Sequence, residues 1–162
     1  MSARKSTLLS VFILALCFVV DFSSKKIAFK HLTVVQNEGI AFGLFSELPR
    51  SFQTLSLSVV FCLILLIFIL CQSLVLPKLT MLRVSLSFFF GGTLSNVVDR
   101  FIDGKTIDFI PLFNRYHCNI ADVIIFISLF FILKEIFTKH EQIWFPQSER
   151  KKYLIDLSLI HI

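Results

Sequence analysis

The chain has 162 residues, of which 56% are hydrophobic, and its formal net charge is +5. The mean hydropathy is +0.81. A water-soluble domain of this size leaves much of its surface exposed and could not hide so many apolar side chains, so the composition predicts an integral membrane protein. The basic residues lie beside apolar stretches and near the C-terminus, which is typical of membrane flanks and not of a nucleic-acid-binding surface.

Four membrane-spanning helices are predicted, because about 20 helical residues cross the hydrocarbon core of a bilayer. The longest stretch without a charged residue is 51–76. The positions of Lys and Arg favour a topology with both termini in the cytoplasm. The sequence therefore predicts an all-α membrane fold, a four-helix bundle over residues 1–140 with a cytoplasmic tail over 141–162. The expected spans are residues 6–21, 52–76, 79–98 and 120–137.

Two of these spans raise alternatives. The first follows basic residues, as a cleavable signal peptide does, but the stretch Asp21–Lys25 lacks an A-x-A-like cleavage site, so a retained signal anchor is predicted. Arg83 lies one turn inside the third span, and we expect its long side chain to reach the interface. The four cysteines lack CxxC spacing, which predicts packing residues and not a disulfide framework or a zinc site.

The two outer segments, residues 22–51 and 99–119, are expected to carry small β elements on the outer, periplasmic face. In the first, β-branched residues lead into a turn at Asn37-Glu38-Gly39. The second contains a turn at Asp103-Gly104 and a short alternation around Ile107–Ile110.

Two aspartates lie where predicted spans end and begin on the same side of the membrane. Asp99 ends the third span and Asp122 opens the fourth, so they can face each other if these helices are neighbours. For a single aspartate, a role as a boundary marker is the simpler explanation, and Asp122 in a first turn also suits the helix dipole. Further polar residues share this level, and such clustering is costly unless the groups satisfy one another or bind something. They are Asp21, Lys25, Asn37, Asn96, Arg100 and Asn119.

Two close carboxyls cannot easily both ionise, so one tends to keep a proton. The pair then supplies a base to activate water and an acid to protonate a leaving amine, as in aspartic proteases. A metal site built from Asp99, Asp122 and His117 is the weaker alternative, and no metal or cofactor is predicted. A small cation or proton transporter or channel with rim carboxylates remains a competing hypothesis, as does a scaffold protein whose acids only set helix register.

Four short blocks follow one another in the chain, and together they resemble the motifs of the bacterial lipoprotein signal peptidases, also called signal peptidase type II. The resemblance covers about residues 5–140 and implies a four-helix fold. Two positions depart from the family pattern, because Ser95 replaces the usual Gly and Cys118 replaces the usual Phe. The blocks are "DFSSK" from Asp21, "NEGIAFGLF" from Asn37, "GGTLSNVVDR" from Gly91 and "NIAD" from Asn119.

The resemblance implies an aspartyl endopeptidase of the bacterial inner membrane. Its substrates would be diacylglyceryl-modified prolipoproteins, cleaved just before the lipidated cysteine, with Asp99 and Asp122 as the catalytic pair. We expect a monomer that works beside membrane phospholipid, with its site at the outer face. The residues implied in substrate binding are Asn37, Asn96, Arg100 and Asn119, and those implied in structural support are Asp21, Lys25 and Gly39.

Overall fold

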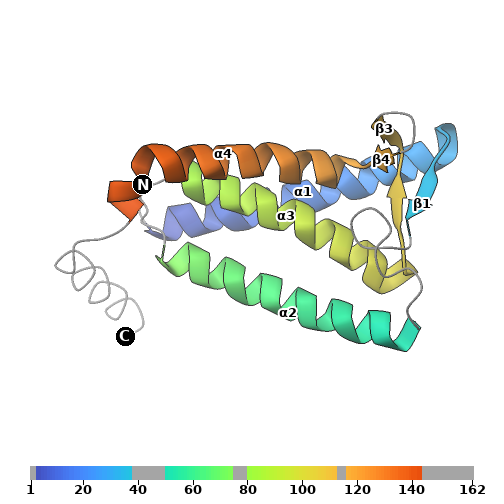
Figure 1. Ribbon diagram of the computed structural model, residues 1–162, viewed down its shortest axis with the longest axis horizontal. Helices are drawn as coiled ribbons and strands as arrows, with labels where there is room; N and C mark the ends of the chain where they lie inside the picture. Colours follow the sequence, from blue (N-terminus) through green and yellow to red (C-terminus); the bar gives the residue numbers. More distant parts are fainter. Residues whose placement is uncertain (1–2, 38–49, 75–79, 113–115, 144–162) are drawn as a thin grey trace.

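The computed structural model describes residues 3–37, 50–74, 80–112 and 116–143. In these segments four long helices run along the long axis of the molecule (Figure 1). Each overlaps one of the predicted spans. The helices are α1 (Ala3–His31), α2 (Arg50–Leu74), α3 (Thr80–Asp103) and α4 (Ile120–Ile143).

Three helices continue past their predicted ends. The first span is predicted to end at Asp21, whereas the helix α1 runs on to His31. The residues after Asp21 keep one buried face at helical spacing, which includes Lys25 and Ala28. α3 likewise continues to Asp103, and α4 extends beyond residue 137. Most of the predicted tail lies outside the described residues, and its boundary at residue 140 stays a prediction.

The segments 22–51 and 99–119 contain small β elements, and their location on the outer face stays a prediction. β1 (Val35–Asn37) pairs antiparallel with β2 (Thr106–Asp108), and β3 (Ile110–Leu112) pairs antiparallel with β4 (Tyr116–Cys118). In Figure 1 they lie at the end of the bundle where α3 ends and α4 begins. Gly104 has a φ of 74°, which confirms the turn predicted at Asp103-Gly104. The turn predicted beyond Asn37 lies outside the described residues.

α3 is the central helix and packs against α1, α2 and α4. Two adjacent glycines allow the closest approach. A Cβ added at Gly91 would lie 2.9 Å from Cys17 Cβ, and one at Gly92 would lie 2.8 Å from the carbonyl oxygen of Ala121. Small residues at such contacts let helix backbones approach closely. α3 therefore contacts α1 and α4 at the same level, one turn before Ser95 and Asn96.

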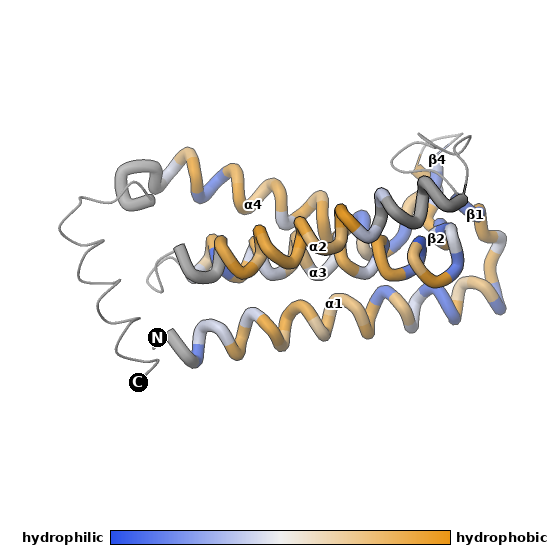
Figure 2. Tube along the Cα trace, turned by 90° about the horizontal axis from the view of Figure 1, so that it is seen from below, coloured by the Kyte–Doolittle hydropathy of each residue, from blue (hydrophilic) through white to orange (hydrophobic). Residues whose placement is uncertain are grey.

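Several polar and charged side chains are buried, whereas many large apolar side chains are exposed. Asp21 is 0% exposed and Lys25 4%, whereas Phe126 is 76% exposed and Phe137 80%. Figure 2 shows hydrophobic residues along all four helices and hydrophilic ones near β1 and β2. Within the described segments α1 and α3 are long and apolar enough to cross a membrane, and α2 holds a shorter apolar stretch, Ser58–Leu70. This distribution suits a protein whose outer surface faces lipid. A crossing by all four helices stays a prediction.

The expectation that Arg83 reaches the interface is wrong, because its side chain is only 2% exposed. Glu135 of α4 is buried too, at 7%. α3 and α4 run antiparallel, and Asn96 of α3 contacts Asp122 of α4. Arg83 lies as many residues before Asn96 as Glu135 lies after Asp122. Because the helices are antiparallel, Arg83 and Glu135 share one level of the bundle. A negative charge at the same level would offset part of the cost of burying the guanidinium.

We expect Gly92→Ala to lower the free energy of unfolding in detergent by about 1–3 kcal/mol, because the added methyl group meets the backbone of Ala121. Met81→Ala, at a 48% exposed position of the same helix, is the control and should change stability far less. Equal stability of Gly92→Ala and the parent would contradict the close contact of α3 with α4.

Arg83→Leu and Glu135→Leu should each destabilise the bundle by about 3–5 kcal/mol, because each leaves a buried charge uncompensated. The double variant should lose much less than the two single losses together, since neither charge then remains. Unfolding in denaturant measures all three variants. Strictly additive losses would show that the two side chains do not balance each other.

Candidate active site

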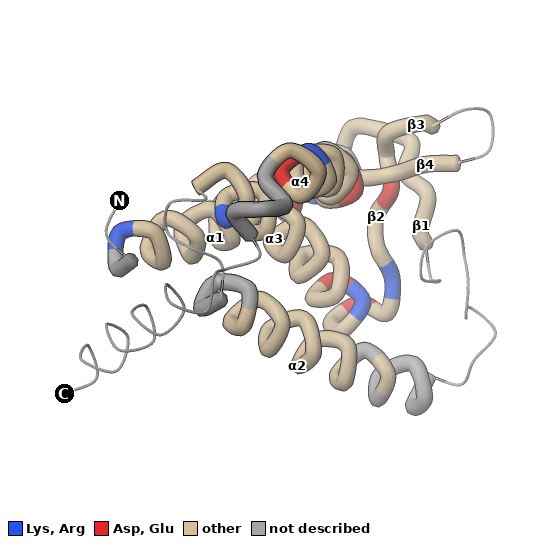
Figure 3. Tube along the Cα trace, turned by 60° about the vertical axis from the view of Figure 1, so that its left-hand side comes forward, with Lys and Arg blue, Asp and Glu red and all other residues tan. Residues whose placement is uncertain are grey.

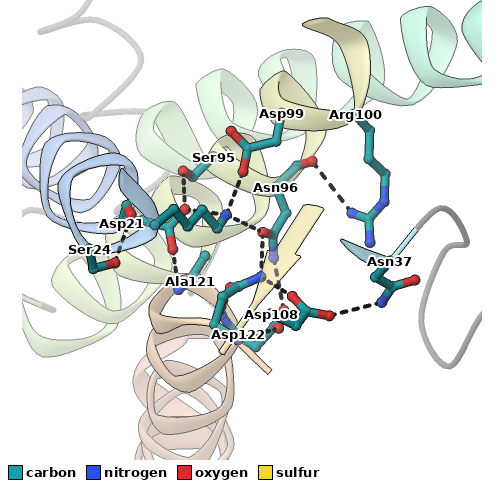
Figure 4. A network of polar contacts seen from close by, with 12 residues as sticks. Asp21, Ser24, Asn37, Ser95, Asn96, Asp99, Arg100, Asp108, Ala121 and Asp122 are labelled. Carbon is teal, nitrogen blue, oxygen red and sulfur yellow. Dashed lines mark hydrogen bonds and ion pairs between the residues drawn. The ribbon is translucent and has the colours of Figure 1, made fainter. Parts of the chain in front are cut away.

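Lys25 links α1 to α3 through hydrogen bonds to Asp21, Asn96 and Asp99, and Figure 4 shows these three partners within a polar network. Its Nζ donates to Asp21 Oδ2 and Asp99 Oδ2, each at 2.5 Å, and to Asn96 Oδ1 at 3.0 Å. Three acceptors match the three protons of an ammonium group. The carboxylate of Asp99 is thus compensated by a direct ion pair with a buried cation.

Asp21 connects three helices. Its Oδ2 accepts a second bond, from Ser95 Oγ at 2.6 Å, and its Oδ1 accepts the backbone N–H of Ala121 at 2.9 Å. Ser24 Oγ donates to the backbone carbonyl oxygen of Asp21 at 2.7 Å. A fully buried carboxylate needs such partners. These contacts support the structural role predicted for Asp21 and Lys25, and they exclude a mere boundary role for Asp21.

Asn119 and Asp122 form a reciprocal cap at the start of α4. The backbone N–H of Asp122 donates to Asn119 Oδ1 at 3.0 Å, and the backbone N–H of Asn119 donates to Asp122 Oδ2 at 3.1 Å. This is a capping box, in which an N-cap side chain and the side chain three residues later each accept the other's backbone N–H. The spacing of "NIAD" follows from this geometry, and the cap holds the Asp122 carboxyl in place.

A further carboxyl, that of Asp108 on β2, lies next to this cap. Asn119 Nδ2 donates to Asp108 Oδ1 at 2.7 Å, and Asn37 Nδ2 donates to Asp108 Oδ2 at 3.1 Å. The side chain of Asp108 is only 3% exposed. The pairing of β1 with β2 places Asn37 and Asp108 within this reach. Asp108 is therefore a member of the site that the sequence analysis missed.

Two amide side chains link the carboxyls. Asn96 Nδ2 donates to Asp122 Oδ1 at 2.8 Å, and Asn119 Nδ2 donates to Asn96 Oδ1 at 3.1 Å. Asp99 and Asp122 are therefore connected only through Lys25 and Asn96 among the hydrogen bonds described here. Asp108 and Asp122, in contrast, bond the same residue, Asn119.

The charged residues that act on Asp122 also differ from those that act on Asp99. Asp108 and Lys25 both act electrostatically on Asp122, whereas the charges that act on Asp99 are those of Lys25, Asp21 and Asp103. Around the last turn of α3 and β2 charged residues gather (Figure 3). Asp108 and Asp122 are thus two acids that interact directly and that both bond Asn119.

Arg100 lies beside this pair. Its Nη1 donates to the backbone carbonyl oxygen of Asn96 at 3.4 Å, and the charges that act on it are those of Asp122, Asp108 and Asp99. A guanidinium stays protonated and presents several donors in a plane. It can therefore hold a substrate carbonyl or carboxyl group next to the acids.

Cys118 of β4 is 6% exposed and also lies near the two acids. Burial raises the pKa of its thiol, and the charges of Asp122 and Asp108 raise it further. The group therefore stays a neutral thiol at neutral pH, not a nucleophilic thiolate. The departure from the family's usual Phe brings a small packing residue to this position.

The structure brings nearly all predicted site residues into one network. Gly39 lies outside the described residues. Asp108 could have been found from alternation, because Thr106 and Asp108 point to one face of β2 and are both buried, whereas Ile107 between them is less so. Among the described side chains, no three His, Cys, Asp or Glu residues form a group that could hold a metal ion. The residues brought together are Asp21, Lys25, Asn37, Asn96, Asp99, Arg100, Asn119 and Asp122.

Comparison with known proteins places these residues in a family context. The family described as signal peptidase (SPase) II matches residues 11–138. A lipoprotein signal peptidase of Aquifex aeolicus is 33% identical over 153 residues, which cover 84% of this chain and 90% of the relative. One from Alteromonas mediterranea is 34% identical over 155 residues and 83% of each chain. One from Moorella thermoacetica is 34% identical over 98 residues, 60% of this chain and 62% of the relative.

Solved structures share the fold. Two structures of a bacterial membrane enzyme, obtained by the in meso method, superpose with a TM-score of 0.63 over 84% of this chain. They are 22% and 21% identical in sequence, and the match covers 92% and 94% of their chains. These values show that the chain shares its fold with these structures over 84% of its length.

We expect Asn119→Ala to lower the free energy of unfolding by about 1–3 kcal/mol, because the cap of α4 and a partner of buried Asp108 are both lost. Asn119→Ser should recover about 1 kcal/mol, since serine also caps helices well. Denaturant unfolding of the two variants measures the difference. Equal losses would show that the cap contributes nothing to stability.

Proposed function

The chain belongs to the signal peptidase II family, and on this premise we propose that it removes the signal peptide from diacylglyceryl-modified prolipoproteins, just before the lipidated cysteine. The reacting groups in this proposal are the carboxyls of Asp108 and Asp122. The observation that carries the proposal is that both bond Asn119 and neither bonds Lys25.

This assignment revises the predicted pair of Asp99 and Asp122. An acid–base residue must change its protonation state during the reaction. Asp99 forms a direct ion pair with Lys25, which suits a structural counter-ion better than a residue that exchanges a proton with the substrate. Asp108 and Asp122 have neutral amide donors instead, so a proton can move between them and a substrate. We therefore assign Asp99 to the support of Lys25.

The chemistry follows from one shared proton. Two interacting carboxyls hold a single proton between them over a range of pH. The ionised carboxyl takes a proton from water as the water oxygen bonds to the scissile carbonyl carbon. The protonated one then donates to the leaving nitrogen as the carbon–nitrogen bond breaks, so that a carboxylic acid and an amine are formed.

Neighbouring residues prepare this step. Asn119 holds both carboxyls, Asn96 bonds Asp122 and Asn37 bonds Asp108. In this proposal these amides position the acids and also border the substrate. Arg100 keeps its predicted role in binding the substrate backbone, because its charge lies next to both acids.

The location of the site suits a lipid-modified substrate. The carboxyls lie at the start of α4 and beside the end of α3, at the end of the bundle opposite the N-terminus of α1 (Figure 1). A cytoplasmic N-terminus therefore puts the site on the outer face of the inner membrane. The acyl chains can stay in the bilayer while the scissile bond reaches the acids. We further propose that one copy of the chain suffices, since all these groups come from it.

The test compares three Asp→Asn variants on a diacylglyceryl-modified prolipoprotein in detergent. Asp108→Asn and Asp122→Asn should each reduce cleavage by about 10²–10⁴-fold, because acid–base catalysis supplies rate factors of that size. Asp99→Asn should retain clearly more activity than either, once the folded fraction of each variant is measured. Activity in Asp108→Asn together with its loss in Asp99→Asn would restore the originally predicted pair. No cleavage by the folded parent would refute the proposed function.

A further inference from the structure

The hydroxyl of Ser95 donates to a side chain of another helix. Ser10, Ser87 and Thr93 each donate to the backbone carbonyl oxygen four residues earlier in their own helix. This is the usual bond of a hydroxyl inside a helix. Ser95 is 1% exposed, and its Oγ reaches from α3 to Asp21 Oδ2 on α1 at 2.6 Å. The hydroxyl therefore serves a contact between helices.

The acceptor of this bond leads directly to the proposed acid pair. Asp21 Oδ2 is held by Ser95 and Lys25, which turns Oδ1 toward the backbone N–H of Ala121. Ala121 is 0% exposed and immediately precedes Asp122 in the first turn of α4. The orientation of the Asp21 carboxyl thus bears on where that turn lies.

We propose that Ser95 is a positioning residue, which acts through Asp21 and the amide of Ala121 to place the Asp122 carboxyl. This inference rests on the proposed function. Without the hydroxyl, Lys25 alone would hold Asp21 Oδ2, and Lys25 also bonds two other oxygens. The Asp21 carboxyl could then turn, and its bond to Ala121 would weaken. Small displacements of a reacting group lower the rate of the chemical step strongly.

The proposal explains why serine matters in this chain. The block "GGTLSNVVDR" has Ser95 at the position where the signal peptidase II family usually has Gly. A glycine has no donor for Asp21, so the two residues are not equivalent here. Changing Ser95 to the residue usual in the family should therefore impair this protein.

The experiment measures kcat and KM for Ser95→Ala and Ser95→Gly on the diacylglyceryl-modified prolipoprotein. We expect Ser95→Ala to lower kcat by about tenfold, the effect of losing one bond to a charged group, and to change KM by less than about twofold. Ser95→Gly should lower kcat at least as much. Ser87→Ala is the matched control, because Ser87 is also buried in α3 but bonds its own helix. Its kcat should equal that of the parent.

Two results would overturn the inference. One is an unchanged kcat in folded Ser95→Ala. The other is an equal loss of kcat in Ser87→Ala, which would indicate a general effect of deleting buried hydroxyls. A second measurement repeats Ser95→Ala in an Asp21→Asn background, where the substitution should have little further effect on kcat if it acts through Asp21. Cleavage by the parent and its loss in Asp108→Asn establish the proposed function separately in the same assay.

Discussion

The burial of one positive charge, the ammonium of Lys25, is the constraint on which this end of the protein depends. A buried ammonium needs compensating charge and an acceptor for each proton. Asp21 and Asp99 supply the charge, and Asn96 supplies the third acceptor. Because these groups come from α1 and α3, the two helices are held in one register. α4 joins them through the bond from Ala121 to Asp21.

The four aspartates of the network differ in their bonding partners. Asp21 and Asp99 bond the ammonium group of Lys25. Asp108 and Asp122 bond amide groups instead. Four aspartates within one small region can therefore serve two purposes, two of them in holding helices together and two in the proposed chemistry. The division comes from where one lysine lies.

The four helices and most of the site could be predicted, because apolar length and short motifs are local signals. The end of α1 could not, since a charge inside an apolar run looks like a boundary until its partner on another helix is known. The expectation that Arg83 reaches the interface fails in a similar way, because the acidic residue at its level, Glu135, lies far away in sequence. Asp108 depends on the pairing of β1 with β2, and within its own segment only the alternation with Thr106 points to it. What the sequence leaves out are contacts between distant segments.

The capping box of α4 has a consequence for how this protein loses activity and structure on heating or in detergent. The same backbone and side-chain groups end the helix and hold the Asp122 carboxyl. Helix termini fray more easily than a packed bundle melts. Fraying of a single turn would withdraw the carboxyl while the rest of the protein keeps its shape. If Asp122 is catalytic, as proposed, loss of this one turn would end activity before the contacts along α3 are lost.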